Sequence, residues 1–303
     1  MKYPSLDTPA LLIDREIMMD NLRFMQDYAD REGVALRPHT KTHKNPAIAK
    51  KQAELGARGI TVAKVGEAEV MAENGLTDLF IANEIVGEKK LLRIRDLCRK
   101  GAKVSFGVDT PCQVEAAEAV FAGEAAPARV LIEIEVGEER SGILHEDAFT
   151  ALLDTIKACP HVEFAGIFSH EGHCYNADTV EDCREKFITS QERTLAFARL
   201  ARERGMEPRT VSIGSTPSLM FGFHILPGIT EIRPGTYVLM DASQGHAIGT
   251  LDRCAATVLT TVISRPTPER VITDVGAKGL TAQTRTKGIC ATPGLGTIRS
   301  EER

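Results

Sequence analysis

The chain has 303 residues, a formal net charge of −5 at pH 7 and 43% hydrophobic residues, enough apolar material for one large core or two modest ones. This charge balance argues against nucleic acid as a partner, and no polybasic arm occurs. No apolar run approaches the length of a membrane span, and the N-terminus lacks a signal-peptide pattern. The seven cysteines are scattered and form no CxxC pair, which indicates reduced thiols in a cytoplasmic protein.

Short apolar runs alternate with helical patterns along most of the chain. After a strand at 10–14 and a helical pattern to about Gly33, we expect eight strands, near 34–37, 59–64, 78–83, 103–109, 129–136, 162–168, 209–213 and 230–233. Helical stretches separate most of them, for example 87–100, 112–122, 145–158 and 179–205. This alternation predicts a parallel sheet, and eight such units predict a (β/α)8 barrel. A doubly wound sheet is the alternative, although it would normally carry a Gly-rich turn after its first strand, and we find none.

The pattern changes after Asp241. Residues 255–264 and 270–276 are β-branched runs separated by a Pro-rich turn, which predicts a mostly antiparallel β domain. We therefore expect a barrel over 15–240 and a second domain made of 1–14 plus 241–303. About sixty residues are few for an independent β domain, so we expect this domain to be truncated.

A cationic segment, Arg37-Pro38-His39-Thr40-Lys41-Thr42-His43-Lys44, follows the first expected barrel strand. Mutual repulsion among these cations should lower the pKa of Lys41. A lysine with a lowered pKa can attack a carbonyl and hold it covalently. Taken alone, the segment slightly favours a solvated basic loop, and the rest of the chain reverses that order.

Small residues follow the seventh and eighth expected strands, where barrels often bind phosphate. Gly214, Ser215 and Thr216 precede a proline that favours a helical turn, so their backbone N–H groups can bind an anion. Gly235, in the segment 233–237, allows the backbone to approach a ligand closely. Each segment alone is more often an ordinary turn, but together they predict a phosphate site. Combined with a reactive lysine, this site suggests pyridoxal phosphate.

Further polar residues follow the fifth and sixth strands. Arg140 is flanked by acids, so its guanidinium either forms a surface ion pair or points into the barrel mouth. His170 and His173 have no third metal ligand in view, so we favour acid–base or hydrogen-bonding roles over metal binding. Cys174 is expected to be a packing residue, and the role of His246 stays open. The remaining loop histidines, His145, His161 and His224, are expected to be structural.

The chain resembles the alanine-racemase-type (fold type III) pyridoxal-phosphate enzymes, most closely the D-threonine aldolase and D-serine dehydratase branch. The motifs are TPALLID, RPHTKTHK, EIEVGEERSG, GSTPS and EIRPGTYVLMD, in the family's order across nearly all of the chain. The segment 274–280 is also similar to the family's second domain.

The resemblance implies a role for each matching site residue. Lys41 would hold the cofactor's aldehyde, Arg140 would face the pyridine nitrogen, and His170 would occupy a position where many relatives carry a tyrosine. Gly214, Ser215 and Thr216, with Tyr237, would hold the phosphate. The resemblance also implies a homodimer in which the β domain of one subunit closes the barrel of the other.

Relatives in this branch bind a divalent metal (Mn or Zn) through a histidine and a nearby Cys or Asp close to the C-terminus. That motif has no counterpart here, so we expect no metal ligands, either because the chain is a fragment or because the metal has been lost.

The resemblance implies a lyase that cleaves D-threonine-like substrates to glycine and an aldehyde, with His170 or His173 as proton acceptor. Dehydration of D-serine to a keto acid and ammonia would use the same residues. A non-catalytic pyridoxal-phosphate carrier, a cofactor-free Schiff-base aldolase and a racemase are the other possibilities. The racemase is disfavoured because no tyrosine follows residue 241.

Overall fold

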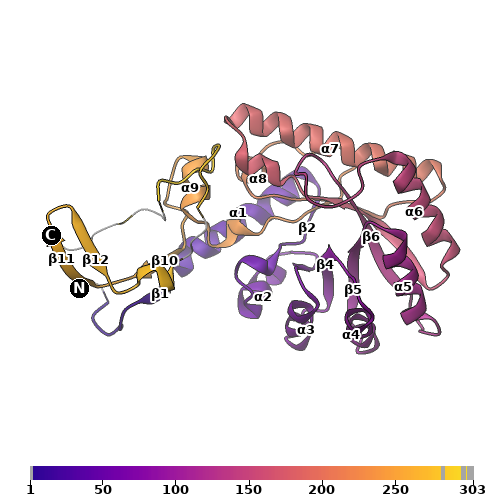
Figure 1. The fold of residues 1–303 in the computed structure, drawn as a ribbon, viewed down its shortest axis with the longest axis horizontal. Helices are drawn as coiled ribbons and strands as arrows, with labels where there is room; N and C mark the ends of the chain where they lie inside the picture. The colour runs from indigo at the N-terminus through magenta and orange to yellow at the C-terminus, as the bar shows by residue number, and fades with distance from the viewer. Residues whose placement is uncertain (1–2, 281–283, 295–297, 299–303) are drawn as a thin grey trace.

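The computed structural model describes residues 3–280, 284–294 and 298. Eight parallel strands form one sheet in the order β2-β9-β8-β7-β6-β5-β4-β3. Their bounds are β2 Ala35–Leu36, β3 Ile60–Val62, β4 Asp78–Glu84, β5 Lys103–Val108, β6 Ala128–Ile134, β7 Val162–Ser169, β8 Thr210–Ile213 and β9 Glu231–Ile232. The sheet closes on itself, because Thr61 N donates to Pro38 O at 2.9 Å and an isolated parallel bridge joins His39 to Thr61. The expected (β/α)8 barrel is confirmed (Figure 1).

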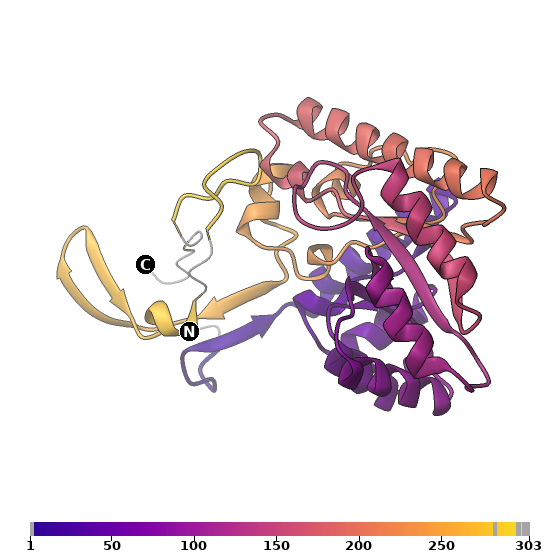
Figure 2. The same cartoon turned by 45° about the vertical axis from the view of Figure 1, so that its right-hand side comes forward.

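Helices cover the outside of this sheet (Figures 1 and 2). They are α1 Arg15–Glu32, α2 Pro46–Glu54, α3 Val65–Glu73, α4 Glu88–Arg99, α5 Pro111–Phe121, α6 Glu146–Ala158, α7 Val180–Glu203 and the short α8 Pro217–Met220. Local chemistry defines α1: the Asp14 carboxylate accepts the N–H groups of Glu16 and Ile17, and Gly33 ends the helix at a φ of 70°. The main apolar core lies between the sheet and these helices.

The barrel interior is filled by a second, smaller apolar cluster. Phe80, Leu131, Ala165 and Phe168 form it, with Phe80 and Phe168 edge to face at 5.0 Å. At the amino end of the strands, Arg37 is buried between Glu231 (2.7 Å) and Asp78 (2.6 Å). Arg37 therefore lies at the opposite end of the barrel from Lys41, contrary to our expectation that it would repel the lysine.

The rest of the described chain forms antiparallel ribbons beside the barrel (Figure 2). Strand β1 (Ala10–Ile13) pairs with β10 (Ala256–Leu259), and β11 (Val262–Thr267) pairs with β12 (Arg270–Thr273). Two short helices that the sequence analysis did not predict flank the ribbons, α9 (Ala242–Ile248) and α10 (Gly276–Gly279). The antiparallel β architecture expected after the barrel is confirmed, and the N-terminal strand belongs to it.

Candidate functional site

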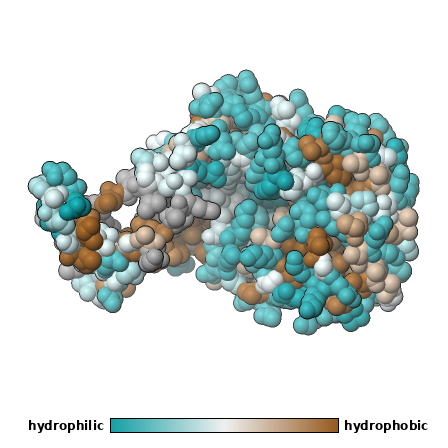
Figure 3. Space-filling model, viewed as in Figure 1, coloured by the Kyte–Doolittle hydropathy of each residue, from teal (hydrophilic) through white to brown (hydrophobic). Residues whose placement is uncertain are grey.

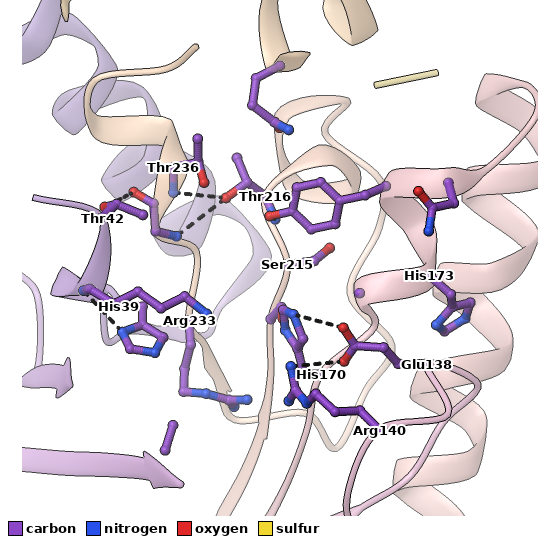
Figure 4. Close-up of a pocket in the computed structure, with 18 of the residues that line it drawn as sticks. His39, Thr42, Glu138, Arg140, His170, His173, Ser215, Thr216, Arg233 and Thr236 are labelled. Atoms are coloured by element: carbon purple, nitrogen blue, oxygen red, sulfur yellow. Dashed lines mark hydrogen bonds and ion pairs between the residues drawn. The ribbon is translucent and has the colours of Figure 1, made fainter. Parts of the chain in front are cut away.

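A cavity of about 530 Å³ opens at the carboxyl ends of the barrel strands. It is large enough for a cofactor-sized molecule. The structure brings most of the predicted site residues into its wall: Lys41, Arg140, His170, His173, Gly214, Ser215, Thr216 and Gly235. Figure 4 shows how several of them converge from different strand ends.

Lys41 lies on the 3-10 turn η1 (Thr40–Thr42), directly after β2. The His39 ring accepts the Lys41 backbone N–H at 3.4 Å, which fixes the start of this turn. Solvent reaches the lysine through the open cavity, yet the surrounding protein penalises its charge and lowers its pKa. The cations Arg140 and Arg233 lower it further, while Glu138 opposes them. The sequence analysis predicted a lowered pKa for Lys41. The cations that lower it, Arg140 and Arg233, are distant from Lys41 in the sequence.

The loops after β8 and β9 form a backbone cradle on the other side of the cavity. The Thr216 hydroxyl accepts the N–H groups of Gly235 (3.4 Å) and Thr236 (3.2 Å), so the two loops are joined. A Cβ atom at Gly235 would lie 2.9 Å from His39 O, and one at Gly214 would lie 3.0 Å from Arg233. Only glycine allows these approaches. The hydrogen bonds from Gly235 N and Thr236 N to the Thr216 hydroxyl are long, so a phosphate can bind these N–H groups instead.

Tyr237 lies outside this cavity, contrary to the place that the resemblance gave it. Its side chain is fully buried, and its hydroxyl accepts a hydrogen bond from Gln52 Nε2 at 2.8 Å. The turn η3 (Thr236–Val238) presents Thr236 to the cavity and directs the next side chain into the core. Tyr175, which the sequence analysis did not single out, lines the cavity instead and accepts the Thr216 N–H at 3.3 Å.

Arg140 is both an ion-pair partner and a cavity residue. Its guanidinium contacts Glu133 at 3.2 Å and Glu138 at 3.1 Å. Ser141 donates to the other oxygen of Glu133 at 2.7 Å. The guanidinium therefore lines the cavity while it pairs with one buried and one partly exposed carboxylate.

His170 is a neutral histidine between Lys41 and the cradle. Its Nδ1 bonds to Gly214 O, and its Nε2 lies 3.9 Å from a Glu138 oxygen. Burial, together with the charges of Lys41 and Arg140, lowers the pKa of His170 to about 3. Because Nδ1 must donate to a carbonyl, Nε2 keeps a lone pair and can accept a proton.

His173 lies on η2 (Gly172–Asn176), farther along the same wall. Its Nε2 is 3.5 Å from Ser190 Oγ, and its buried Nδ1 has no partner within the described part of the chain. Burial lowers its pKa. Over those same residues, no group of three or more His, Cys, Asp or Glu could hold a metal ion, so the residues present do not fit a metal site.

The cavity also contains cations that sequence reasoning missed. Arg233 is buried between the rings of Phe80 and Phe168 and donates to Ser212 Oγ and Ser169 O, both at 2.6 Å. The Arg285 guanidinium stacks on the Tyr175 ring at 4.2 Å. Arg233 is the first residue of the predicted segment 233–237 and could have been considered, whereas Arg285 carries no recognisable motif.

Comparison with known proteins agrees with this architecture. Residues 13–243 match the alanine racemase N-terminal domain family, and 255–302 match the putative serine dehydratase domain. The chain is 37% identical to a D-threonine aldolase of Arthrobacter sp, over 96% of this chain and 77% of that protein. It is 30% identical to a 3-hydroxy-D-aspartate aldolase of Paracoccus denitrificans (strain Pd 1222), over 92% and 74%.

Solved structures of the same kind superpose closely on the chain. D-threonine aldolase from Filomicrobium marinum gives a TM-score of 0.83 at 33% identity, covering 91% of this chain and 75% of that one. D-threo-3-hydroxyaspartate dehydratase from Delftia sp. HT23 gives 0.88 at 31%, covering 96% and 76%. Among the described residues, no helix is long and apolar enough to cross a membrane.

Proposed function

Because the chain belongs to the alanine-racemase-type (fold type III) pyridoxal-phosphate enzymes, as a lyase acting on D-hydroxy amino acids, we propose that it cleaves D-threonine-like substrates to glycine and an aldehyde. The observation that carries this proposal is one cavity in which Lys41, Arg140 and a backbone cradle surround a neutral histidine. When bound, the cofactor supplies an aldehyde that condenses with amines and a ring that withdraws electrons from the bonds at Cα.

The cavity offers a fitting residue for each part of this cofactor. We propose that Lys41 binds the aldehyde covalently and that Arg140 lies against the pyridine nitrogen. Gly214, Ser215, Thr216 and Gly235 bind the phosphate through the cradle. Tyr237 supports the cradle from the core through its bond to Gln52.

Proton transfer falls to the groups beside Lys41. His170 Nε2 is the proposed acceptor for the β-hydroxyl proton, because Nδ1 bonds to Gly214 O and leaves the Nε2 lone pair facing the cavity. The charge of Lys41 is one cause of the low pKa of His170, and covalent use of that amine would remove it. When the hydroxyl loses that proton, its oxygen forms the C=O of the aldehyde and the Cα–Cβ bond breaks. Cα then gains a proton to give glycine, which balances the proton taken up by His170. His173 is the second candidate. It ranks below His170 because its Nε2 already faces Ser190 Oγ.

Product analysis tests this assignment. The purified protein with pyridoxal phosphate is given D-threonine or D-serine, with the L-enantiomers as controls, and glycine, aldehyde, keto acid and ammonia are measured. Glycine and acetaldehyde from D-threonine are expected. A keto acid and ammonia would indicate a dehydratase, loss of optical rotation without products would indicate a racemase, and cofactor binding without turnover would indicate a carrier.

The divalent metal of relatives does not enter these steps, since the described residues give it no ligand group. The same assay with and without Mn²⁺ or Zn²⁺ tests whether metal changes the rate.

We also propose a homodimer of a cytoplasmic protein with a barrel domain over 15–240 and a second domain of 1–14 plus 241–303. Apolar side chains support the dimer at two places. Val86 (63% exposed) and Leu144 (53%) follow β4 and β6 at the cavity end of the barrel, and Leu11 (68%) lies on β1. Hydrophobic residues also gather on the ribbons at the left of Figure 3, where Val262 and Ile263 are exposed. Light scattering measures the mass of the protein in solution and so tests the dimer.

The proposed cytoplasmic location is supported by the cysteines. All seven are free, which is typical of a reducing compartment.

A further inference from the structure

Three neighbouring barrel strands carry acids at the cavity end. Leu131 of β6 belongs to the interior cluster, so Glu133, two residues farther along, also points inward. On β4 the register shifts between Ile81 and Glu84, and the hydrogen bond to Glu133 places the Glu84 carboxyl on the same side. Between β4 and β6 lies β5, whose Gly107 pairs with Glu84 on one side and with Leu131 on the other. Asp109 completes this layer but is already bound by Gln113 (3.0 Å) and Gly142 N (3.4 Å).

Gly107 lets the Phe168 ring pack between these strands. A Cβ atom there would lie 2.9 Å from the Phe168 ring, so only glycine fits inside the barrel at this level. The Glu84 carboxyl is within hydrogen-bonding reach of Glu133. Glu84 Oε1 is buried and receives no N–H or O–H donor from the described residues. Contact between the buried Glu133 carboxyl and the half-buried Glu84 carboxyl strongly disfavours the doubly charged state, so one of them holds a proton.

Glu133 connects this pair to the cofactor cavity. Its side chain is buried, one oxygen accepts from Arg140 at 3.2 Å, and the other accepts from Ser141 at 2.7 Å. Glu133 therefore already faces a guanidinium and a hydroxyl donor on the side of Arg140. The proton resides on Glu84, whose pKa is raised to about 8 by burial and by the Glu133 contact.

We propose that Glu84 is a positioning residue for Arg140: its protonated carboxyl donates to Glu133, and Glu133 then holds the guanidinium against the cofactor ring. The proposal rests on the proposed function, in which Arg140 faces the pyridine nitrogen. When Glu84 loses its proton, a second negative charge appears beside Glu133. Asp109 and Glu138 are also negative there, while Arg140 and Arg233 are the facing cations. Arg140 is then drawn away from the ring toward the acids.

The test follows the holoenzyme through alkaline pH. For wild type we expect kcat to fall several-fold and the cofactor absorbance to shift, both with a midpoint near pH 8, while KM changes little. Glu84→Gln keeps a donor for Glu133 but cannot ionise, so its kcat and absorbance should match wild type at pH 7 and stay flat above it. Glu88→Gln, a substitution at an exposed position on α4, should keep the wild-type profile. An alkaline profile of Glu84→Gln that matches wild type overturns the proposal.

A second measurement separates this proposal from the proposed function. Without cofactor, a carboxyl whose pKa is raised by folding makes the protein less stable as pH rises from about 4.5 to 8. The melting temperature of wild type should therefore fall relative to Glu84→Gln over that interval. Failure to bind pyridoxal phosphate would defeat the proposed function and leave this difference intact, whereas parallel curves would defeat the carboxyl pair. If Glu84→Gln does not fold, the infrared spectrum of wild type decides: absence of a protonated carboxylic acid band at pH 7 overturns the proposal.

Discussion

Lys41 is the residue on which the proposed chemistry depends, and the chain supplies its own control a few residues away. Lys41→Ala should abolish the absorbance of covalently bound cofactor and reduce kcat by roughly 10²–10⁴-fold, because no other lysine of the described residues lines the cavity. Lys44→Ala removes an equal charge that is paired with Glu67 at 3.1 Å outside the cavity, and should change kcat by less than about twofold. Absorption spectra and steady-state kinetics compare the two. Equal losses in both variants would mean that the whole segment acts only through its charge.

Arg285 bears on which substrates fit. Its guanidinium lines the cavity on Tyr175, and no carboxylate of the described residues forms an ion pair with it. A substrate with a side-chain carboxylate would supply one. We expect Arg285→Gln to lower kcat/KM for D-3-hydroxyaspartate, relative to D-threonine, by roughly tenfold or more, the value of one charge-assisted hydrogen bond. Arg253→Gln is the matched control, since Arg253 stacks on Phe24 away from the cavity. An unchanged ratio would remove Arg285 from substrate selection.

Tyr237 and Arg37 show where reasoning from single residues fails. Both stand beside correct motif positions, and both side chains point away from the cavity, into the core and to the other end of the barrel. A motif locates a stretch of backbone, whereas the direction of each side chain follows from the local turn. The pairing of Glu84 with Glu133 was missed for a different reason, because it requires the strand register around Gly107.

At the scale of elements, the segment 284–292 forms part of the cavity wall by docking on η2 and α9. Ile289 N donates to Ala177 O and Ser243 Oγ donates to Cys290 O, both at 2.7 Å. Gly288 makes this possible: its φ is +69°, and a Cβ atom would lie 2.5 Å from the Asn176 carbonyl carbon. Gly288→Ala should therefore detach the segment.

Gly294 provides the control for that prediction, because its φ is +63° but nothing lies within 4 Å of an added Cβ. Both substitutions cost about 1–2 kcal/mol for the left-handed backbone, and only Gly288→Ala adds a collision. We expect faster tryptic cleavage in this segment and a higher KM for Gly288→Ala alone. Equal cleavage rates in the two variants would show that the segment is not docked by this contact.

The elements themselves were largely predictable. All eight barrel strands and the four named helices lie where apolar runs and helical periodicity placed them, within one or two residues at their ends. The helices α2 and α3 were passed over because they have only nine residues each, too few for a clear period. The sequence analysis assigned residues 1–14 to the second domain but named no partner for their strand. Only the structure gives its pairing with β10, about 250 residues away.

At the scale of the whole molecule, folding holds several histidines in their neutral form and makes stability depend on pH. Burial lowers the pKa of His43 to about 4 and of His170 to about 3, and lowers that of His39 as well. In the unfolded chain each titrates near 6.5. Below that pH the unfolded state binds protons that the native state does not, so stability falls as pH decreases from about 6.5 toward 4.

Glu84 acts in the opposite direction, since its raised pKa removes stability between about pH 4.5 and 8. Below pH 6.5, the stability lost through the three histidines exceeds the stability gained through Glu84. Between pH 6.5 and 8, Glu84 is the only one of these four groups that still changes the stability. The free energy of unfolding should therefore be greatest near pH 6.5. Urea unfolding at pH 5, 6.5 and 8 measures it.

His43→Asn isolates one histidine of the three. The asparagine oxygen can replace Nδ1 as acceptor for Asn45 N, and His43 lies outside the cavity wall, so kcat should be unaffected. Below pH 6.5, the unfolding free energy of the variant should fall less steeply with decreasing pH than that of wild type, by up to about 1.4 kcal/mol per pH unit, the contribution of one titrating group. From pH 6.5 to 8, the change in unfolding free energy should match wild type. If the unfolding free energies of both proteins run parallel below pH 6.5, His43 is protonated in the native state and burial does not hold it neutral.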